Sequence, residues 1–168
     1  MTISMYQASV PVMVRSLNNL IAILGKATAH ADAKKVDPDV FGGCRLIADM
    51  HPLSRQIQIA SDVAKGGAAR LAGVEPPSWA DDEKTMADLV ERLKKTISYL
   101  ESLKPEQIDG SEDRKVTLKV GPNTVDFQGL PYLLNFVLPN VLFHVTTAYN
   151  ILRENGVDIG KRDFIGGI

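Results

Sequence analysis

The chain has 168 residues, of which 45% are hydrophobic and 23% are charged, and its 19 basic and 20 acidic side chains give a formal net charge of −1. This composition is typical of a soluble globular protein, and we expect residues 1–168 to form one domain with a substantial core. No cluster of Lys and Arg accompanies aromatic residues, which argues against nucleic-acid binding. No apolar run approaches the roughly 18 residues of a membrane helix, and the lone Cys44 suits a reducing compartment. We therefore expect a cytoplasmic protein without membrane contact.

Three segments repeat apolar residues at three- and four-residue steps, the spacing of an amphipathic helix. They span Ser4–Ala33, Pro52–Leu71 and Asp82–Leu103. Proline and paired glycines in Val36–Gly43 predict a turn after the first helix. Small residues around Gly66 and Gly67 should let a neighbouring helix approach the second one closely. The charged face of the third helix is expected to be a solvated surface.

The spacing then changes from helical to alternating. Lys115–Val120 and Thr124–Gln128 alternate apolar and polar residues on either side of Gly121-Pro122-Asn123. This pattern predicts a β-hairpin at about 115–128, which should fold back on the helices because an isolated hairpin is marginally stable.

A final helix is predicted over Pro131–Gly156. Within it, Pro139 predicts a break or a kink, and the following tail, Val157–Ile168, should be irregular. The predicted fold is thus mainly all-α, a four-helix bundle with a small β-hairpin inserted before the last helix.

One polar side chain interrupts the most apolar face of this last helix. The stripe consists of Val137, Val141, His144, Ala148 and Ile151. A buried imidazole requires a hydrogen-bond partner, and Gln56 on the second helix is a candidate. Burial disfavours the charged form, so His144 could act as a neutral base near pH 7 and is the candidate catalytic residue. The candidate ligand-pocket residues are Gln56, His144, Tyr149 and Asn140.

A metal site would need three or more ligands that converge on one point. The three histidines are His30, His51 and His144, and no two of them are three or four residues apart. A His51–His144 pair completed by a carboxylate, such as Asp49 or Asp62, remains an alternative, so these two histidines are the candidate metal ligands.

Large apolar side chains are too numerous for one buried face of the last helix. They are Phe136, Leu142, Phe143 and Tyr149. We expect some of them to cover a second copy in an isologous homodimer. The alternative is that helices of the same chain cover all of them.

Three stretches of the sequence resemble a known family. They read SMYQASVPVMVRSLNNL, PLSRQIQIASDVAKGGAARLAG and FHVTTAYNILRENGVDIGKRDFIG. Together they resemble an uncharacterised bacterial domain-of-unknown-function family, which is grouped with the DinB/YfiT-like superfamily of proposed metalloenzymes. The resemblance implies a DinB-like four-helix bundle that is commonly dimeric. Active members of the superfamily include metal-dependent thiol transferases that act on low-molecular-weight thiols.

The superfamily motif combines a histidine on the second helix with an H-x-x-x-H pair on the last. The first histidine of that pair corresponds to His144, and its partner position holds Ala148. Gln56 is nearest to the second-helix position, and His51 lies earlier, just before Pro52. The resemblance therefore implies a degenerate metal site in this chain.

Two hypotheses follow from the sequence. The first is a dimeric small-molecule-binding or scaffold protein built around His144, with no bound cofactor. The alternative is a metal-dependent enzyme of the thiol transferase or hydrolase type, which would use an atypical site with a divalent metal such as Zn, Ni or Mn.

Overall fold

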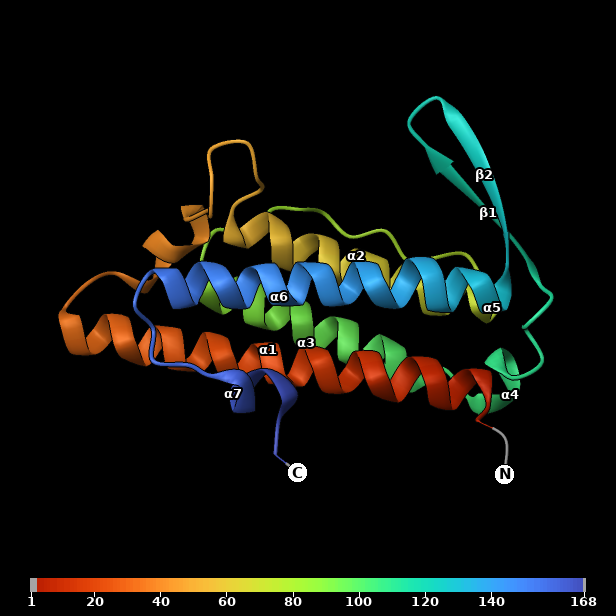
Figure 1. Ribbon diagram of the computed structural model, residues 1–168, viewed down its shortest axis with the longest axis horizontal. Helices are drawn as coiled ribbons and strands as arrows, with labels where there is room; N and C mark the ends of the chain where they lie inside the picture. The colour runs from red at the N-terminus through yellow and green to blue at the C-terminus, as the bar shows by residue number, and fades with distance from the viewer. Residues whose placement is uncertain (1–2, 168) are drawn as a thin grey trace.

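The amphipathic segments fold into four long helices that pack side by side, with a hairpin protruding at one end (Figure 1). The computed structural model describes residues 3–167, and of Val120 only the backbone. In chain order the elements are α1 (Met5–Lys34), the 3₁₀ helix η1 (Pro38–Gly43), α2 (Leu53–Leu71), α3 (Met86–Ser102), α4 (Pro105–Ile108), β1 (Lys115–Val120), β2 (Asn123–Gln128), α5 (Gly129–Tyr132), the π-helical turn η2 (Leu133–Val137), α6 (Leu138–Glu154) and α7 (Lys161–Ile165). The predicted fold class is confirmed.

The four long helices form a ring in the order α1, α3, α2, α6. Helices α1 and α2 each pack against both α3 and α6, and they hardly touch each other. The apolar stripes meet along the axis of the ring, where the fully buried side chains include Leu17, Leu24, Ile57, Leu93 and Ile151. Each such side chain contributes about 1.5–3 kcal/mol when it is removed from water.

Helix α1 is long and apolar enough, by length and composition alone, to cross a membrane. Its apolar face, from Met5 to Ala31, is buried in the bundle against α3 and α6. The apolar character of α1 is therefore explained by its position in the core of the bundle.

The small residues of α2 bring the last helical segment close, as predicted. A Cβ atom added at Gly67 would lie 2.5 Å from Cγ1 of Val137 in η2, which is closer than two non-bonded carbon atoms can approach. Glycine at this position lets α2 pack against η2 and α6 without a gap. This close packing places the inner face of α6 directly against α2.

The last helix is irregular just before its proline. Helix α5 continues into the wider turn η2 and then into α6, where Pro139 occupies the first turn. Proline has no N–H and its ring crowds the preceding turn, so the backbone widens there. The break predicted at Pro139 thus takes the form of a π-helical turn, and α6 is regular from there through His144.

The third helix begins later than predicted, at Met86 instead of Asp82. The Thr85 hydroxyl accepts a hydrogen bond from the Asp88 N–H at 3.1 Å, and the Asp88 carboxylate accepts one from the Thr85 N–H at 2.9 Å. This reciprocal capping box fixes the first turn. Asp82 and Glu83 are consequently left in the linker that precedes the helix.

The predicted hairpin is present, and β2 begins one residue earlier than predicted. The strands pair antiparallel, from Lys115 opposite Gln128 to Val120 opposite Asn123. Val116 and Leu118 are buried, so one face of β1 packs on the protein.

The prediction of an irregular tail is wrong for its middle part, because residues Lys161–Ile165 form the short helix α7. Asp163 accepts a hydrogen bond from the Gly160 N–H at 2.8 Å, which caps this helix. The Lys26 ammonium pairs with Asp163 at 2.7 Å, and the Asn19 amide donates to the Phe164 carbonyl at 3.0 Å. These contacts hold α7 against α1.

Replacing Gly67 with alanine tests the close contact between α2 and η2. Alanine normally stabilises a helix by about 1 kcal/mol relative to glycine. At Gly67 the added methyl group would meet Val137, and we expect a net loss of about 1–3 kcal/mol in the free energy of unfolding, measured by urea denaturation.

Gly25→Ala is the matched control, because Gly25 is exposed on α1 and a Cβ atom there meets nothing within 4 Å. This variant should be as stable as the wild type or more stable. Adding Val137→Ala to Gly67→Ala should recover part of the loss. A Gly67→Ala protein that is more stable than the wild type would contradict the packing described here.

Candidate functional site

His144 projects from the inner face of α6 toward the first turns of α2. Its exposed fraction is 9%, and that of Gln56, which faces it, is 2%. The predicted hydrogen bond is present, with 2.6 Å between Nδ1 of His144 and Oε1 of Gln56. The two side chains therefore form a polar contact between α2 and α6 in an apolar interface.

A second hydrogen bond fixes the direction of the first. Gln56 Nε2 donates to the backbone carbonyl of His51 at 3.1 Å, so the amide nitrogen of Gln56 points away from His144 and its oxygen points toward it. An amide oxygen only accepts, so Nδ1 of His144 must carry the proton. Nε2 of a neutral ring is then the acceptor. Among residues 3–167 nothing hydrogen-bonds this atom, and it is not fully buried, so solvent reaches it.

The surroundings keep His144 neutral. Burial lowers the pKa of His144, and the nearby charges of His51 and Arg55 lower it further. The ring is consequently uncharged at neutral pH and presents one lone pair, on Nε2. Such a group can accept a hydrogen bond, take up a proton, or bind a metal ion.

The other two candidate pocket residues, Asn140 and Tyr149, are also on α6. Asn140 precedes His144 by one turn on α6 and is half-buried. Tyr149 follows it by five residues, which turns it about 140° around the helix. Its hydroxyl donates to the Ile159 carbonyl at 3.4 Å, and its ring meets Phe164 edge-on at 6.1 Å. The structure brings Gln56 and His144 together and places Tyr149 in a separate contact.

The candidate metal ligand His51 lies on the surface at the end of the loop before α2. The part of His51 that contacts the site is its backbone carbonyl, through Gln56. Arg55, one turn further on, pairs with Asp81 of the α2–α3 linker at 2.5 Å. Arg55 is thus a permanent cation near the ring, and it is tied to the linker.

The donor set does not fit the three-histidine metal centre implied by the family resemblance. Ala148 stands one turn after His144, fully buried, and presents a methyl group where the motif has its second imidazole. Gln56 uses its oxygen to accept the Nδ1–H of His144. Within residues 3–167, no three His, Cys, Asp or Glu side chains are grouped closely enough to hold a metal ion.

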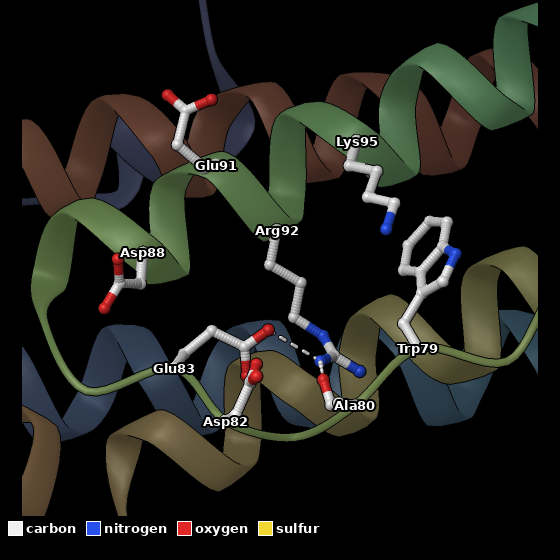
Figure 2. Close-up of a pocket in the computed structure, with 8 residues that line it drawn as sticks. All are labelled: Trp79, Ala80, Asp82, Glu83, Asp88, Glu91, Arg92 and Lys95. Carbon is white, nitrogen blue, oxygen red and sulfur yellow. Dashed lines mark hydrogen bonds and ion pairs between the residues drawn. The ribbon is translucent and has the colours of Figure 1, made fainter.

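Figure 2 shows a second cluster of polar residues, where α2, α3 and their linker meet. The Arg92 side chain is only 2% exposed, and its guanidinium pairs with Asp62 at 2.7 Å, Asp81 at 2.9 Å and Glu83 at 2.7 Å. Burial alone would raise the pKa of Glu83, but hydrogen bonds from Arg92 and Gln58 lower it, so the carboxylate stays ionised.

A tryptophan of the linker completes this cluster. The ammonium groups of Lys65 and Lys95 lie 4.7 and 4.5 Å from the ring centroid of Trp79, within cation–π range. Trp79, Arg92 and Lys95 border a hollow of about 640 Å³ (Figure 2). Lys65 also pairs with Asp62. We assign this cluster to holding the linker on the bundle, because Arg92 of α3 pairs with both Asp81 and Glu83 of the linker.

The sequence analysis did not identify Arg92 or Trp79. The expectation that the charged face of α3 is only a solvated surface is incomplete, since Lys95 borders the hollow. One signal was available: Arg92 follows Leu89 by three residues and therefore lies on the buried stripe of α3. Its partners could not have been found by spacing, because Asp81 and Glu83 belong to the linker.

The fold and this site define a DinB-type four-helix bundle that keeps one histidine of the motif. The chain is similar to a crystal structure of a DinB family member protein from Shewanella denitrificans, with 38% sequence identity and a TM-score of 0.87, over 97% of this chain and 92% of that chain. Residues 5–165 match the family described as a domain of unknown function, DUF1993, and the chain belongs to this family. No match is found among curated proteins. The family resemblance noted from the sequence is confirmed.

The lowered pKa of His144 predicts how stability depends on pH. The unfolded chain, where histidine has its ordinary pKa of about 6.5, binds a proton at a higher pH than the folded protein does. The stability that neutral His144 contributes is therefore fully present above the unfolded pKa of about 6.5, and it is lost as the pH falls toward the lower pKa of the folded protein. Urea denaturation from about pH 8 to pH 5 should show this loss in the wild type and a smaller one in His144→Gln.

Gln56→Glu should raise the pKa of His144, because a carboxylate beside Nδ1–H favours the charged imidazolium. An NMR titration should then give His144 a higher pKa than in the wild type. A pKa of His144 that is equal in both proteins would contradict the hydrogen-bond geometry.

Proposed function

We propose that this DUF1993 protein binds a small molecule at His144, and that the metal site of its superfamily has degenerated in this chain. The proposal rests mainly on one observation, the Gln56–His144 hydrogen bond, which commits Nδ1 to an internal contact and leaves Nε2 as a neutral acceptor. Ala148 supports it, since a buried methyl group stands where a second ligand would be needed.

The ligand class follows from the atom that faces it. A neutral Nε2 accepts a hydrogen bond, so the bound molecule needs a donor such as a hydroxyl, an amine or a thiol. Asn140 is the nearest polar residue before His144 on the same helix, one turn away. Arg55 adds positive charge nearby and disfavours a cationic ligand.

A metal-dependent enzyme of the thiol transferase or hydrolase type is the second candidate. The observation in its favour is that His51 lies close enough to His144 for its charge to lower the pKa of His144. A divalent metal such as Zn, Ni or Mn would have to be held by these two histidines and by groups outside the protein. We rank it second because the third protein ligand is lacking among residues 3–167.

Metal analysis of protein purified without an affinity tag separates the two candidates. We expect far less than one Zn, Ni or Mn per chain, and no rise in the thermal midpoint when metal is added. One metal ion per chain that is lost in His144→Ala and kept in His30→Ala would refute the binding-protein proposal. His30 is a suitable control because it is the remaining histidine and lies near Gly156.

A fragment screen by NMR tests the binding site itself. Neutral fragments with a donor group should shift the ring signals of His144, and binding should be lost in His144→Ala but not in His30→Ala. A screen in which no donor fragment moves these signals would count against a site at this ring.

We further propose that the protein is a homodimer. Of the four large side chains in question, Phe136 stacks with Tyr132 at 5.8 Å and Tyr149 meets Phe164, so both have partners within the chain. Leu142 and Phe143 remain 38% and 55% exposed.

Other exposed leucines extend this apolar surface along the same helical segment. Leu130 is 40% exposed and Leu134 is 47% exposed, and both precede Leu142 at four-residue steps. Leu130, Leu134 and Leu142 follow one another along α5, η2 and α6. An apolar row of this kind can be self-complementary about a two-fold axis, which favours a second copy as its partner.

Light scattering at micromolar concentration should give twice the chain mass. Leu134→Glu and Leu142→Glu should each give monomers, because a charge would be buried in the interface. Ile47→Glu is the matched control, since Ile47 is 60% exposed and lies outside this apolar row. A monomeric wild type would remove the dimer proposal.

A further inference from the structure

We infer that a hollow between the end of α2 and strand β1 binds a small molecule that carries a phosphate group. The hollow has a volume of about 450 Å³, and its charged lining consists of Arg70, Glu75, Arg114, Lys115 and Lys119. We call it the basic hollow. Its size lies within the range of small-molecule sites in proteins.

Most cations of the basic hollow form no ion pair with a carboxylate among residues 3–167. Lys115 pairs with Asp126 at 2.7 Å, but among residues 3–167 neither Arg70, Arg114 nor Lys119 forms an ion pair. Glu75 likewise has no ion-pair partner there. Three uncompensated cations and one carboxylate leave a net charge of +2 in one concave place, on a protein whose formal net charge is −1.

The cluster around Arg92 shows what a purely structural arrangement looks like in this fold. There, the guanidinium of Arg92 has three carboxylate partners within 2.9 Å. The positive charge of the basic hollow lacks such partners and is available to an anion from solution.

The Arg70 side chain lies back along α2, over Gly66 and beside Tyr132. Its Nη1 lies 2.6 Å from the position that a Cβ atom of Gly66 would occupy, so the guanidinium fills the space of the missing side chain. The same atom donates to the Tyr132 hydroxyl at 3.5 Å. Glycine in mid-helix costs about 1 kcal/mol relative to alanine, and here it makes room for the guanidinium.

Arg114 is held against the end of α2. Its Nη1 donates to the Leu71 carbonyl at the end of α2 and lies 3.0 Å from the Cβ position of Gly73. One of its five N–H groups is used in that contact, and the others remain available. A guanidinium group that is already held in this way loses little freedom when it binds an anion.

The chemistry of the lining points to a phosphate monoester. Such a group carries a charge of about −1.5 to −2 at pH 7, which matches the excess positive charge of the hollow. Planar guanidinium groups bind phosphate oxygens through paired hydrogen bonds. Glu75 can accept a hydrogen bond from a hydroxyl group on the remainder of the molecule.

The basic hollow is separate from His144. Arg70 follows Gln56 by fourteen residues, or about 21 Å along α2. The inference therefore does not depend on the function proposed for His144, and each can fail alone.

Isothermal titration with inorganic phosphate, at constant ionic strength in a chloride buffer, tests the inference. We expect saturable binding to the wild type that is weakened about tenfold in Arg70→Gln and in Lys119→Gln, since each loses a charged hydrogen-bond donor. Lys34→Gln is the control, because Lys34 is in the last turn of α1, at the opposite end of the bundle from the hairpin (Figure 1). Circular dichroism checks that the variants are folded.

Glu75→Gln provides a test in the opposite direction. Removing the one carboxylate should tighten phosphate binding several-fold, a result that damaged folding could not produce. Phosphate that binds no better than chloride would overturn the inference, and so would equal affinity in the wild type, Arg70→Gln, Lys119→Gln and Glu75→Gln. A single-stranded oligonucleotide that binds more tightly than phosphate, with the same dependence on Arg70 and Lys119, would overturn the assignment to a small molecule.

Discussion

The hydrogen bond between Gln56 and His144 is the constraint on which the proposed site depends. An imidazole buried between two helices requires a partner, and the partner decides which ring nitrogen carries the proton. Gln56 has no freedom to reverse its amide, because its nitrogen donates to the His51 carbonyl. The loop before α2 thus fixes the amide, the amide fixes the ring, and the ring presents Nε2 as a neutral acceptor.

The charged cluster around Arg92 is linked to that site through the α2–α3 linker. Asp81 pairs with Arg92 at 2.9 Å and with Arg55 at 2.5 Å, and Arg55 is one of the cations that lower the pKa of His144. A buried guanidinium therefore anchors the linker, and the linker positions a cation near the imidazole. The ion pairs thus position the cation near the ring. The close packing at Gly67 sets how near α6, which carries His144, lies to α2.

Much of the fold could be predicted from spacing alone, because three- and four-residue apolar steps reflect the helix geometry directly. Helices α1 and α2 begin within one residue of the predicted positions, and Gln56 and His144 could be paired since each lies on a buried stripe. The start of α3 was misplaced because a local capping box at Thr85 outweighs the acidic residues before it. The contacts of Arg92 and the basic hollow depend on where the linker and the hairpin lie against α2, and periodicity carries no information about that placement.

The tautomer of His144 is the most direct test of this account. Nitrogen-15 NMR of histidine-labelled protein at neutral pH should show a protonated Nδ1 and an unprotonated Nε2 on this ring, with no averaging between the two forms. A ring that carries its proton on Nε2, that is doubly protonated at neutral pH, or that exchanges rapidly between tautomers would contradict it.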